Sequence, residues 1–323
     1  MAHSSPNHLV ARPGSSALRF LVCRPSPPAS RSQFLSSLPF AVRLSSSRAT
    51  DSSSSSLPPP PPPSRWITEL RARVGKCISF GCDNQQISRA AAVARAIALE
   101  WRDLLAGSEG FLTGGRRGLD RHKIAWGEMD SFGHVNNVNY YRYAESARVN
   151  WITNFAVHVD PAHRSEWSEL MSPKATGLIM RSLKANFKFV GACLKPAPLC
   201  TSPMVYPDNI SVYHKLRTKP ERDAAPSAFM LDCVILSHQH RRIAARLEED
   251  IVIYDYKAAR KASMPPFMLD LFAETYKLQV EETARARGRI WDLIAAVERL
   301  EKETWDREDA VEDMGSLKGA HKV

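Results

Sequence analysis

The stretch "WGEMDSFGHVNNVNYYRYAESAR", residues 126–148, places polar and turn-forming residues directly before a segment with helical periodicity. Gly133 allows a tight turn, and Asn136 and Asn137 are favoured N-cap residues at the point where a helix must begin. One stripe at helical spacing follows, formed by Tyr140, Ala144, Ala147, Trp151 and Phe155. The pattern predicts a helix over 137–155, and its two alanines allow that helix to approach a sheet closely.

Strand-like segments surround this helix. A short strand is expected at 122–128, and four more are expected after the helix, with the third of them, 229–238, apolar on both faces like a central strand. The other three should each bury one face, consisting of Ile179, Leu183, Ala185, Phe187 and Phe189; of Ile210, Val212, His214 and Leu216; and of Ile243, Ala245, Leu247, Ile251 and Ile253. Short connections between these strands predict an antiparallel sheet packed on one long helix, an α+β fold.

Helical segments flank this central region. Residues 66–106 have helical periodicity, with Asp83 as a cap and an end at Gly107. The glycine-rich stretch 107–118 lacks a preceding strand and a Lys-Ser/Thr signature, so it is interpreted as a connector and not as a phosphate-binding loop. Residues 265–305 again read as a helix, and its apolar stripe must be buried against its own domain or a partner: Ile290, Leu293, Ile294, Val297 and Leu300.

The positive charge of the chain is concentrated at its N-terminus. Residues 1–50 hold six Arg, no Lys and no acid, and the first acid is Asp51. Without these six, 38 basic and 34 acidic residues remain, so most of the net charge of +10 belongs to a segment with the composition of an organellar transit peptide. An organellar location is therefore expected, with the mitochondrial matrix favoured over the chloroplast, and a disordered basic tail is the alternative. The small charge of the remainder argues against a nucleic-acid partner.

The boundaries of the chain follow from composition. Five serines and six prolines in 52–63 cannot form a core and predict a stiff spacer. The expected divisions are a transit peptide at 1–50, a linker at 51–65, a helical extension at 66–119, a central domain at 120–256 and a second helical extension at 257–323. Residues 190–202 interrupt the strand pattern, as a loop or as an unspliced intron in the gene model.

Composition also restricts the class of protein. Hydrophobic residues make up 44% of the chain, enough for a core, and no apolar run reaches the ~18–20 residues that a membrane helix needs. The six cysteines form no C-x-x-C pair and have no histidines at zinc spacing, and the "HQH" of residues 238–240 offers too few ligands. The spacing therefore indicates no metal site, and the cysteines indicate free thiols in a reducing compartment.

The chemistry of the opening stretch depends on one acid beside a helix start. Asp130 lies at a predicted strand end, four residues before His134. A helix N-terminus offers unpaired N–H groups and a partial positive charge. Such donors polarise a carbonyl and hold its developing oxyanion, while a carboxylate attacks the carbonyl or activates a water. The arrangement favours acyl transfer.

The same residues resemble the motif of the hot-dog-fold thioesterases, the 4-hydroxybenzoyl-CoA thioesterase-like group. Members of that group show an Asp, a few residues, Gly-His-Val-Asn-Asn, and then a helix with Tyr, Glu and Arg. The chain further resembles a fungal mitochondrial branch through "CISFGC" before the motif and "MPPFM" after the last strand. The resemblance covers roughly 66–305 and implies a hot-dog fold, a long helix wrapped by an antiparallel sheet.

The resemblance also implies an activity and its residues. The chain would hydrolyse an acyl-CoA or acyl-carrier-protein thioester, without a metal or redox cofactor, as a homodimer or higher homo-oligomer. Asp130 would be nucleophile or general base, with backbone N–H groups at the helix start facing the thioester carbonyl. The implied catalytic set is Asp130, His134, Asn136, Asn137 and the secondary Glu128; the implied substrate-binding set is Gly133, Tyr140, Tyr141, Glu145 and Arg148.

Each of these residues also has a structural interpretation. Asp130 and His134 can stabilise the turn, the two asparagines can cap the helix, and Glu145 with Arg148 can form an ion pair. His214 and Glu249 fall on apolar strand faces, typical of core residues. Arg241 and Arg242 beside the last hairpin either contact the phosphates of coenzyme A or lie in solvent.

Two other functions are compatible with such a fold. A non-catalytic hot-dog protein could serve as a mitochondrial assembly or binding factor, with the helical extensions receiving a partner. A hot-dog dehydratase would need an Asp-x-Asn-Pro-x-x-His pattern, which the sequence lacks.

Overall fold

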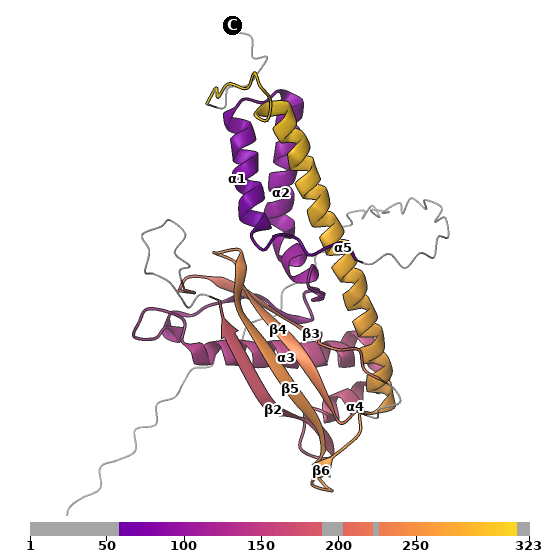
Figure 1. Ribbon diagram of the computed structural model, residues 1–323. Coiled ribbons are helices and arrows are strands. Elements are labelled where there is room, and N and C mark those ends of the chain that lie inside the picture. Colours follow the sequence, from indigo (N-terminus) through magenta and orange to yellow (C-terminus); the bar gives the residue numbers. More distant parts are fainter. Residues whose placement is uncertain (1–57, 189–202, 222–225, 315–323) are drawn as a thin grey trace, which may run out of the picture. The chain divides into compact units, whose positions relative to one another are not determined.

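The computed structural model describes residues 58–188, 203–221 and 226–314. The predicted transit peptide, the segment 190–202 and Phe189 lie outside these residues. The described part contains the expected long helix and antiparallel sheet, together with helices on either side of them in sequence (Figure 1). The α+β prediction is confirmed.

The sheet has six strands in the order β1-β3-β4-β5-β2, with β6 paired to β5, and every pairing is antiparallel. The strands are β1 (Gly118–Lys123), β2 (Thr176–Phe187), β3 (Asn209–Leu216), β4 (Ala228–Ser237), β5 (Arg242–Asp255) and β6 (Arg260–Lys261). The apolar β4 is central, as predicted. The first strand lies earlier than the expected 122–128, because residues 126–128 form a 3₁₀ turn instead.

The long helix α3 (Asn137–Asn154) lies against β1, β3 and β4. Its predicted stripe is buried, and Ala144 and Ala147 are both 0% exposed, which permits the close approach. After α3 the chain forms three short elements that the sequence did not indicate: a π-helical turn at Phe155–Val159, a 3₁₀ turn at Pro161–His163 and the helix α4 (Arg164–Glu169). The ring of Trp167 in α4 stacks on Phe155 with the centroids 5.0 Å apart.

Two β-bulges correct the predicted strand faces. The register between β2 and β5 shifts between Met180 and Ser182. The side chain of Met180, before the bulge, and that of Leu183, after it, both face the core. Ile179 therefore does not share a face with Leu183, contrary to the prediction. The register between β4 and β5 also shifts, so Ile243 packs against a different cluster from Ala245. An extra residue inverts a period-2 pattern, and alternation in sequence alone does not locate it.

The flanking helices are α1 (Trp66–Ser79), α2 (Asn84–Gly107) and α5 (Pro266–Thr304). Figure 1 shows them lying side by side. The helical region expected at 66–106 consists of two helices, separated by Gly81 with φ of 79°. Asp83 caps α2 in a capping box with Gln86, as its position predicted. The predicted stripe of α5 is buried against α1 and α2, so it is covered by its own chain.

The sheet is covered on both faces at β3 and β4. Alternate residues of β3 and β4 divide between two clusters: Val212 and Ile235 pack with α3, whereas Tyr213 and Val234 pack with α1, α2 and α5. Polar contacts add to this attachment, since the Gln279 side chain of α5 bonds the backbone N–H and C=O of Leu216 at 2.9 and 3.0 Å.

The proline run also contributes to the folded part. The carbonyl oxygens of Pro59 and Pro60 accept hydrogen bonds from Arg287 and Trp291 of α5 at 3.0 and 2.9 Å. These prolines therefore lie along α5 before the chain enters α1.

Candidate active site

The loop that precedes α3 is held in a closed shape by its own backbone. Met129 and Val135 form an antiparallel bridge, and the N–H of Asp130 donates to the carbonyl of His134 at 2.7 Å. Gly133 has φ of 73°, a conformation that favours glycine. The N–H of Val135 reaches the carbonyl of Met204 at 2.9 Å, which attaches the loop to the segment before β3. The Asp-to-His spacing of four residues is thus set by a tight turn.

The half-buried carboxylate of Asp130 faces into this turn. Its Oδ1 accepts hydrogen bonds from the N–H groups of Phe132 at 2.9 Å and His134 at 3.3 Å. Within the described part of the chain, Oδ2 receives no hydrogen bond. One oxygen therefore fixes the orientation of the carboxylate, and the other is available to a water or a substrate. Both the structural and the catalytic interpretation of Asp130 fit this geometry.

The start of α3 offers fewer donors than the sequence suggested. The side chain of Asn136 is the N-cap and accepts from the N–H of Val138 at 3.0 Å, while the N–H of Asn139 donates to the carbonyl of Asn136 at 2.9 Å. Of the first three helical residues, only Asn137 has an N–H with no bond to a described residue. An oxyanion at this helix end would thus meet chiefly Asn137.

Glu128 and Asn139 connect the loop to the helix. The Glu128 carboxylate accepts from the N–H of Ala125 at 2.7 Å and so stabilises the 3₁₀ turn. Its carbonyl accepts from the N–H of Asn136 and from Nδ2 of Asn139, both at 2.9 Å. Asn139 is 8% exposed, and sequence reasoning missed it, because a polar residue one turn into a helix gives no signal of a partner eleven positions earlier.

The tyrosines of α3 lie farther from the loop. Tyr140 is 5% exposed and packs edge-on against Phe187 with ring centroids 5.1 Å apart. Burial raises the pKa of its phenol, so it stays neutral. Tyr141 is half-buried and contacts the same phenylalanine, with centroids 6.4 Å apart. Both residues therefore form a wall between α3 and the end of β2.

Glu145 and Arg148 lie in a separate place. They line a cavity of about 380 Å³ between α3 and β2, whose other walls are mostly apolar. At 1.5 Å per residue, Asn136 and Arg148 are roughly 18 Å apart along the helix. Asp130 does not line this cavity. The predicted residues therefore divide into a group at the helix start and a pair at the middle of the helix.

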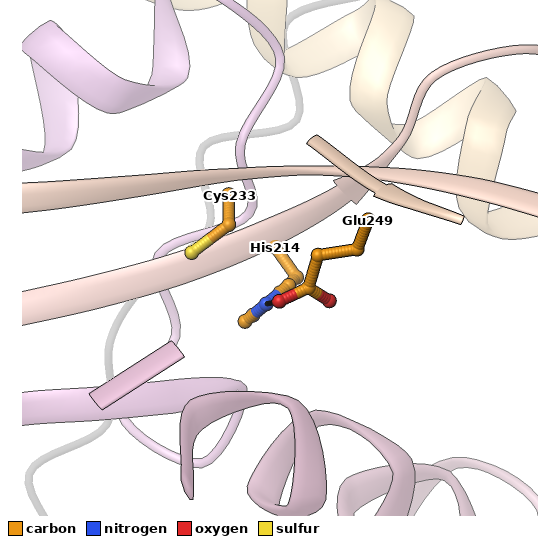
Figure 2. A group of neighbouring side chains, drawn as sticks. All are labelled: His214, Cys233 and Glu249. Carbon is orange, nitrogen blue, oxygen red and sulfur yellow. Dashed lines mark ion pairs between the residues drawn. The ribbon is translucent and has the colours of Figure 1, made fainter. Parts of the chain in front are cut away.

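Arg148 pairs with Glu249 and not with Glu145. Its Nη1 lies 2.9 Å from Oε1 of Glu249, and Nε2 of His214 lies 3.3 Å from the same oxygen. Figure 2 shows the imidazole of His214 and the carboxylate of Glu249 directed toward each other, with Cys233 nearby. Glu249 and His214 are 0% and 1% exposed. The sequence placed His214 and Glu249 on apolar strand faces. That they contact each other and Arg148 is seen only in the structure.

Electrostatics explains why a buried carboxylate is tolerated here. Burial alone raises the pKa of Glu249, but His214 and Arg148 outweigh it and hold that pKa below its ordinary value. Burial, with the nearby Glu249, raises the pKa of the Cys233 thiol well above its ordinary value. His214, Cys233 and Glu249 have ligand atoms within 4.8 Å of one another and could hold a metal ion. Arg148 already balances the charge of Glu249. Its guanidinium would therefore repel a metal cation bound at these three residues.

Comparison with known proteins concerns the central part of the chain. Residues 124–272 match the model of the thioesterase-like superfamily. This segment contains α3, α4 and the strands β2 to β6. Its antiparallel sheet on one long helix is the hot-dog fold, as the sequence resemblance implied. No curated protein matches the chain.

Several solved structures are similar to about half of the chain. The PA2801 protein of Pseudomonas aeruginosa has 21% identity and a TM-score of 0.34, over 47% of this chain and 95% of that one. A Thermus thermophilus thioesterase solved with coenzyme A and Zn has 15% identity and a TM-score of 0.34, over 51% and 98%. The DHNA-CoA thioesterase of Staphylococcus aureus has 14% identity and a TM-score of 0.34, over 48% and 85%.

A membrane-spanning helix is absent from the described residues, whose helices are all too short or too polar to cross a bilayer.

Proposed function

We propose that the protein hydrolyses the thioester of an acyl-CoA or an acyl-carrier protein to a carboxylic acid and a thiol. The observation that carries this proposal is the carboxylate of Asp130, oriented through Oδ1 by two backbone N–H groups at the entrance of α3. The match of residues 124–272 to the thioesterase-like superfamily supports the same reaction class.

Asp130 can act in either of two ways. As general base, it takes a proton from a water, whose oxygen attacks the carbonyl carbon; the tetrahedral intermediate then expels the thiolate, which receives the proton from Asp130. As nucleophile, its oxygen attacks the carbonyl carbon and expels the thiolate; a water then hydrolyses the resulting anhydride, which restores the Asp130 carboxylate, and the water supplies one proton to the product acid and one to the thiolate. In both routes, the N–H of Asn137 and the partial positive charge of the helix start stabilise the oxyanion.

The other residues would support this chemistry. His134 follows the turn and can orient the water or the substrate, while Glu128 and Asn136 hold the loop and the helix start in place. The acyl group would extend along α3, past Tyr140 and Tyr141.

We further propose that the protein works as a homodimer or a higher homo-oligomer. The 12-residue strand β2 is at the edge of the sheet, and its outer side pairs with no described strand. Such an edge is a template for pairing with another chain. Four large apolar side chains around the Asp130 loop are also exposed, namely Trp126, Phe132, Val138 and Tyr206. Light scattering of the purified protein should give a multiple of the monomer mass.

A mitochondrial matrix location is proposed from the composition of residues 1–50 alone. Fluorescence of the full chain fused to a reporter, beside a fusion that lacks residues 1–50, tests it. Diffuse signal from both fusions would contradict it.

The decisive experiment compares the full chain with the Asp130→Asn variant on a series of acyl-CoA thioesters from short to long chains. The asparagine oxygen can still accept both turn hydrogen bonds, so the loop should persist while the charge is lost. Turnover should fall by about 100-fold or more. The exposed Asp309→Asn, after α5, is the matched control and should keep full activity.

The alternative is a non-catalytic hot-dog protein that serves as a mitochondrial assembly or binding factor. It is favoured by the helices α1, α2 and α5, which lie largely outside the segment matched by the superfamily model. Absence of hydrolysis from a folded protein that co-sediments with a large particle would support this role. Hydrolysis that depends on Asp130 would exclude it.

A further inference from the structure

A second cavity, of about 480 Å³, lies away from the Asp130 loop. Its walls come from the residues at the start of α1, from the hairpin between β4 and β5 with the beginning of β5, and from the end of β2. The α1 part lies outside the segment 124–272. The cavity is therefore built jointly by the hot-dog sheet and the N-terminal helical extension.

The lining of this cavity is strongly basic. Five cationic side chains contribute to it, and no carboxylate of the described residues does: Arg65, Lys188, Arg241, Arg242 and Arg246. Arg246 is neutralised by Glu109, with both guanidinium contacts at 2.5 Å. Arg65, Lys188 and Arg241 form no ion pair with a described residue.

Unneutralised like charges that converge on one cavity repel one another, and a polyanion would relieve this repulsion. Arginine matches phosphate best, since its planar fork can donate two parallel hydrogen bonds to it. The first turn of α1 adds to the attraction, because Ile67 and Thr68 line the cavity at a helix start whose N-cap, Arg65, makes no side-chain capping bond.

The cavity also has apolar walls. Ile67, Leu105 and Ile243 line it beside the cations. Its volume falls within the roughly 300–1,000 Å³ typical of small-molecule sites. The lining therefore suits a compact ligand that combines closely spaced phosphates with a flat or apolar body, as a nucleotide does.

We propose that this cavity binds the phosphorylated nucleotide end of coenzyme A. The phosphates would bind between Arg65 at the start of α1 and Arg241 in the β4–β5 hairpin. This inference rests on the proposed thioesterase function for the identity of the ligand. It gives the N-terminal extension a role in carrier recognition.

The test is titration calorimetry of the full chain with coenzyme A and with ADP, at low and at high salt. The Arg65→Gln/Arg241→Gln double variant removes one cation from each wall. Its Kd for both ligands should rise about ten-fold or more, as expected for lost charge-assisted hydrogen bonds. The Lys257→Gln/Lys261→Gln double variant is charge-matched, changes two exposed residues at β6, and should bind like the unmodified chain. Added salt should weaken binding to the unmodified chain.

Hydrolysis assays separate this inference from the proposed function. The Arg65→Gln/Arg241→Gln variant should show a raised KM for an acyl-CoA and unchanged kinetics on the corresponding pantetheine thioester, which carries no phosphate. Equal Kd values in this variant and the β6 variant would overturn the inference, and hydrolysis by both would leave the function intact. Arginine-dependent binding of ADP without any hydrolysis would support the phosphate site and overturn the thioesterase proposal.

Discussion

Nη1 of Arg148 lies 2.9 Å from Oε1 of Glu249, and this ion pair joins the middle of α3 to β5. The arginine side chain is 16% exposed and the glutamate is 0% exposed, so the pair is almost entirely removed from water. The same arginine lines the cavity between α3 and β2. A single side chain therefore belongs both to the core of the fold and to a surface that a ligand can reach.

Replacing Arg148 by Met should destabilise the protein by about 3–5 kcal/mol, because the buried carboxylate of Glu249 would lose its guanidinium partner. Urea unfolding measures this difference. The matched control is Arg181→Met, which removes an ion pair to Asp250 whose arginine side chain is 52% exposed and should cost about 0–1 kcal/mol. Recovery of stability in an Arg148→Met/Glu249→Leu double variant would confirm that the stranded charge is the cause.

The contribution of Glu249 should depend on pH. Its folded-state pKa is below the ordinary value of 4.5, so the charged form stabilises the fold above that pH. This stabilisation should disappear as the pH falls through the lower, folded-state pKa. The unfolding free energies of the protein and of Glu249→Gln should therefore differ at pH 7 and converge at acid pH. A difference that stayed constant from pH 7 to pH 3 would contradict the ion-pair interpretation.

Gly133→Ala should destabilise the Asp130 loop through backbone strain alone. The residue has φ of 73°, and an added Cβ would meet nothing within 4 Å. The expected cost is about 1–2 kcal/mol, the penalty of the left-handed conformation for a residue with a Cβ. Gly127→Ala is the matched control, since it also has open space and has no positive φ. Thermal unfolding of both variants measures the contrast, and Gly133→Asn should recover part of the loss.

Ala147→Leu should destabilise the packing of α3 against the sheet. Ala147 is 0% exposed and lies in the cluster between that helix and the strands. A larger side chain there forces shifts that cost about 1–3 kcal/mol. Ser146→Leu adds a similar volume on the exposed side of the same helix and should leave the urea midpoint nearly unchanged. Similar losses in the two variants would show that the close approach of α3 to the sheet is not the cause.

Much of the fold could be predicted from local patterns. The start of α3 follows from Asn136 as N-cap, its buried stripe from helical spacing, and the central place of β4 from apolar residues on both faces. The two bulges could not be predicted, because an inserted residue changes which face Ile179 and Ile243 occupy without changing the composition. The start of α2 could also be predicted, because Asp83 is a favoured N-cap residue.

The sequence by itself determined the order of helix and strands, the acid-and-turn motif at Asp130 and the cap at Asn136, because these features arise from residues close together in the chain. Only the tertiary structure decided that Arg148 pairs with Glu249, that α5 is covered by α1 and α2, and that Arg65 and Arg241 line one cavity. These relationships join residues that lie far apart in the sequence. Such long-range contacts depend on how the helices and the sheet pack against one another. Residue spacing and composition within one segment do not determine that packing.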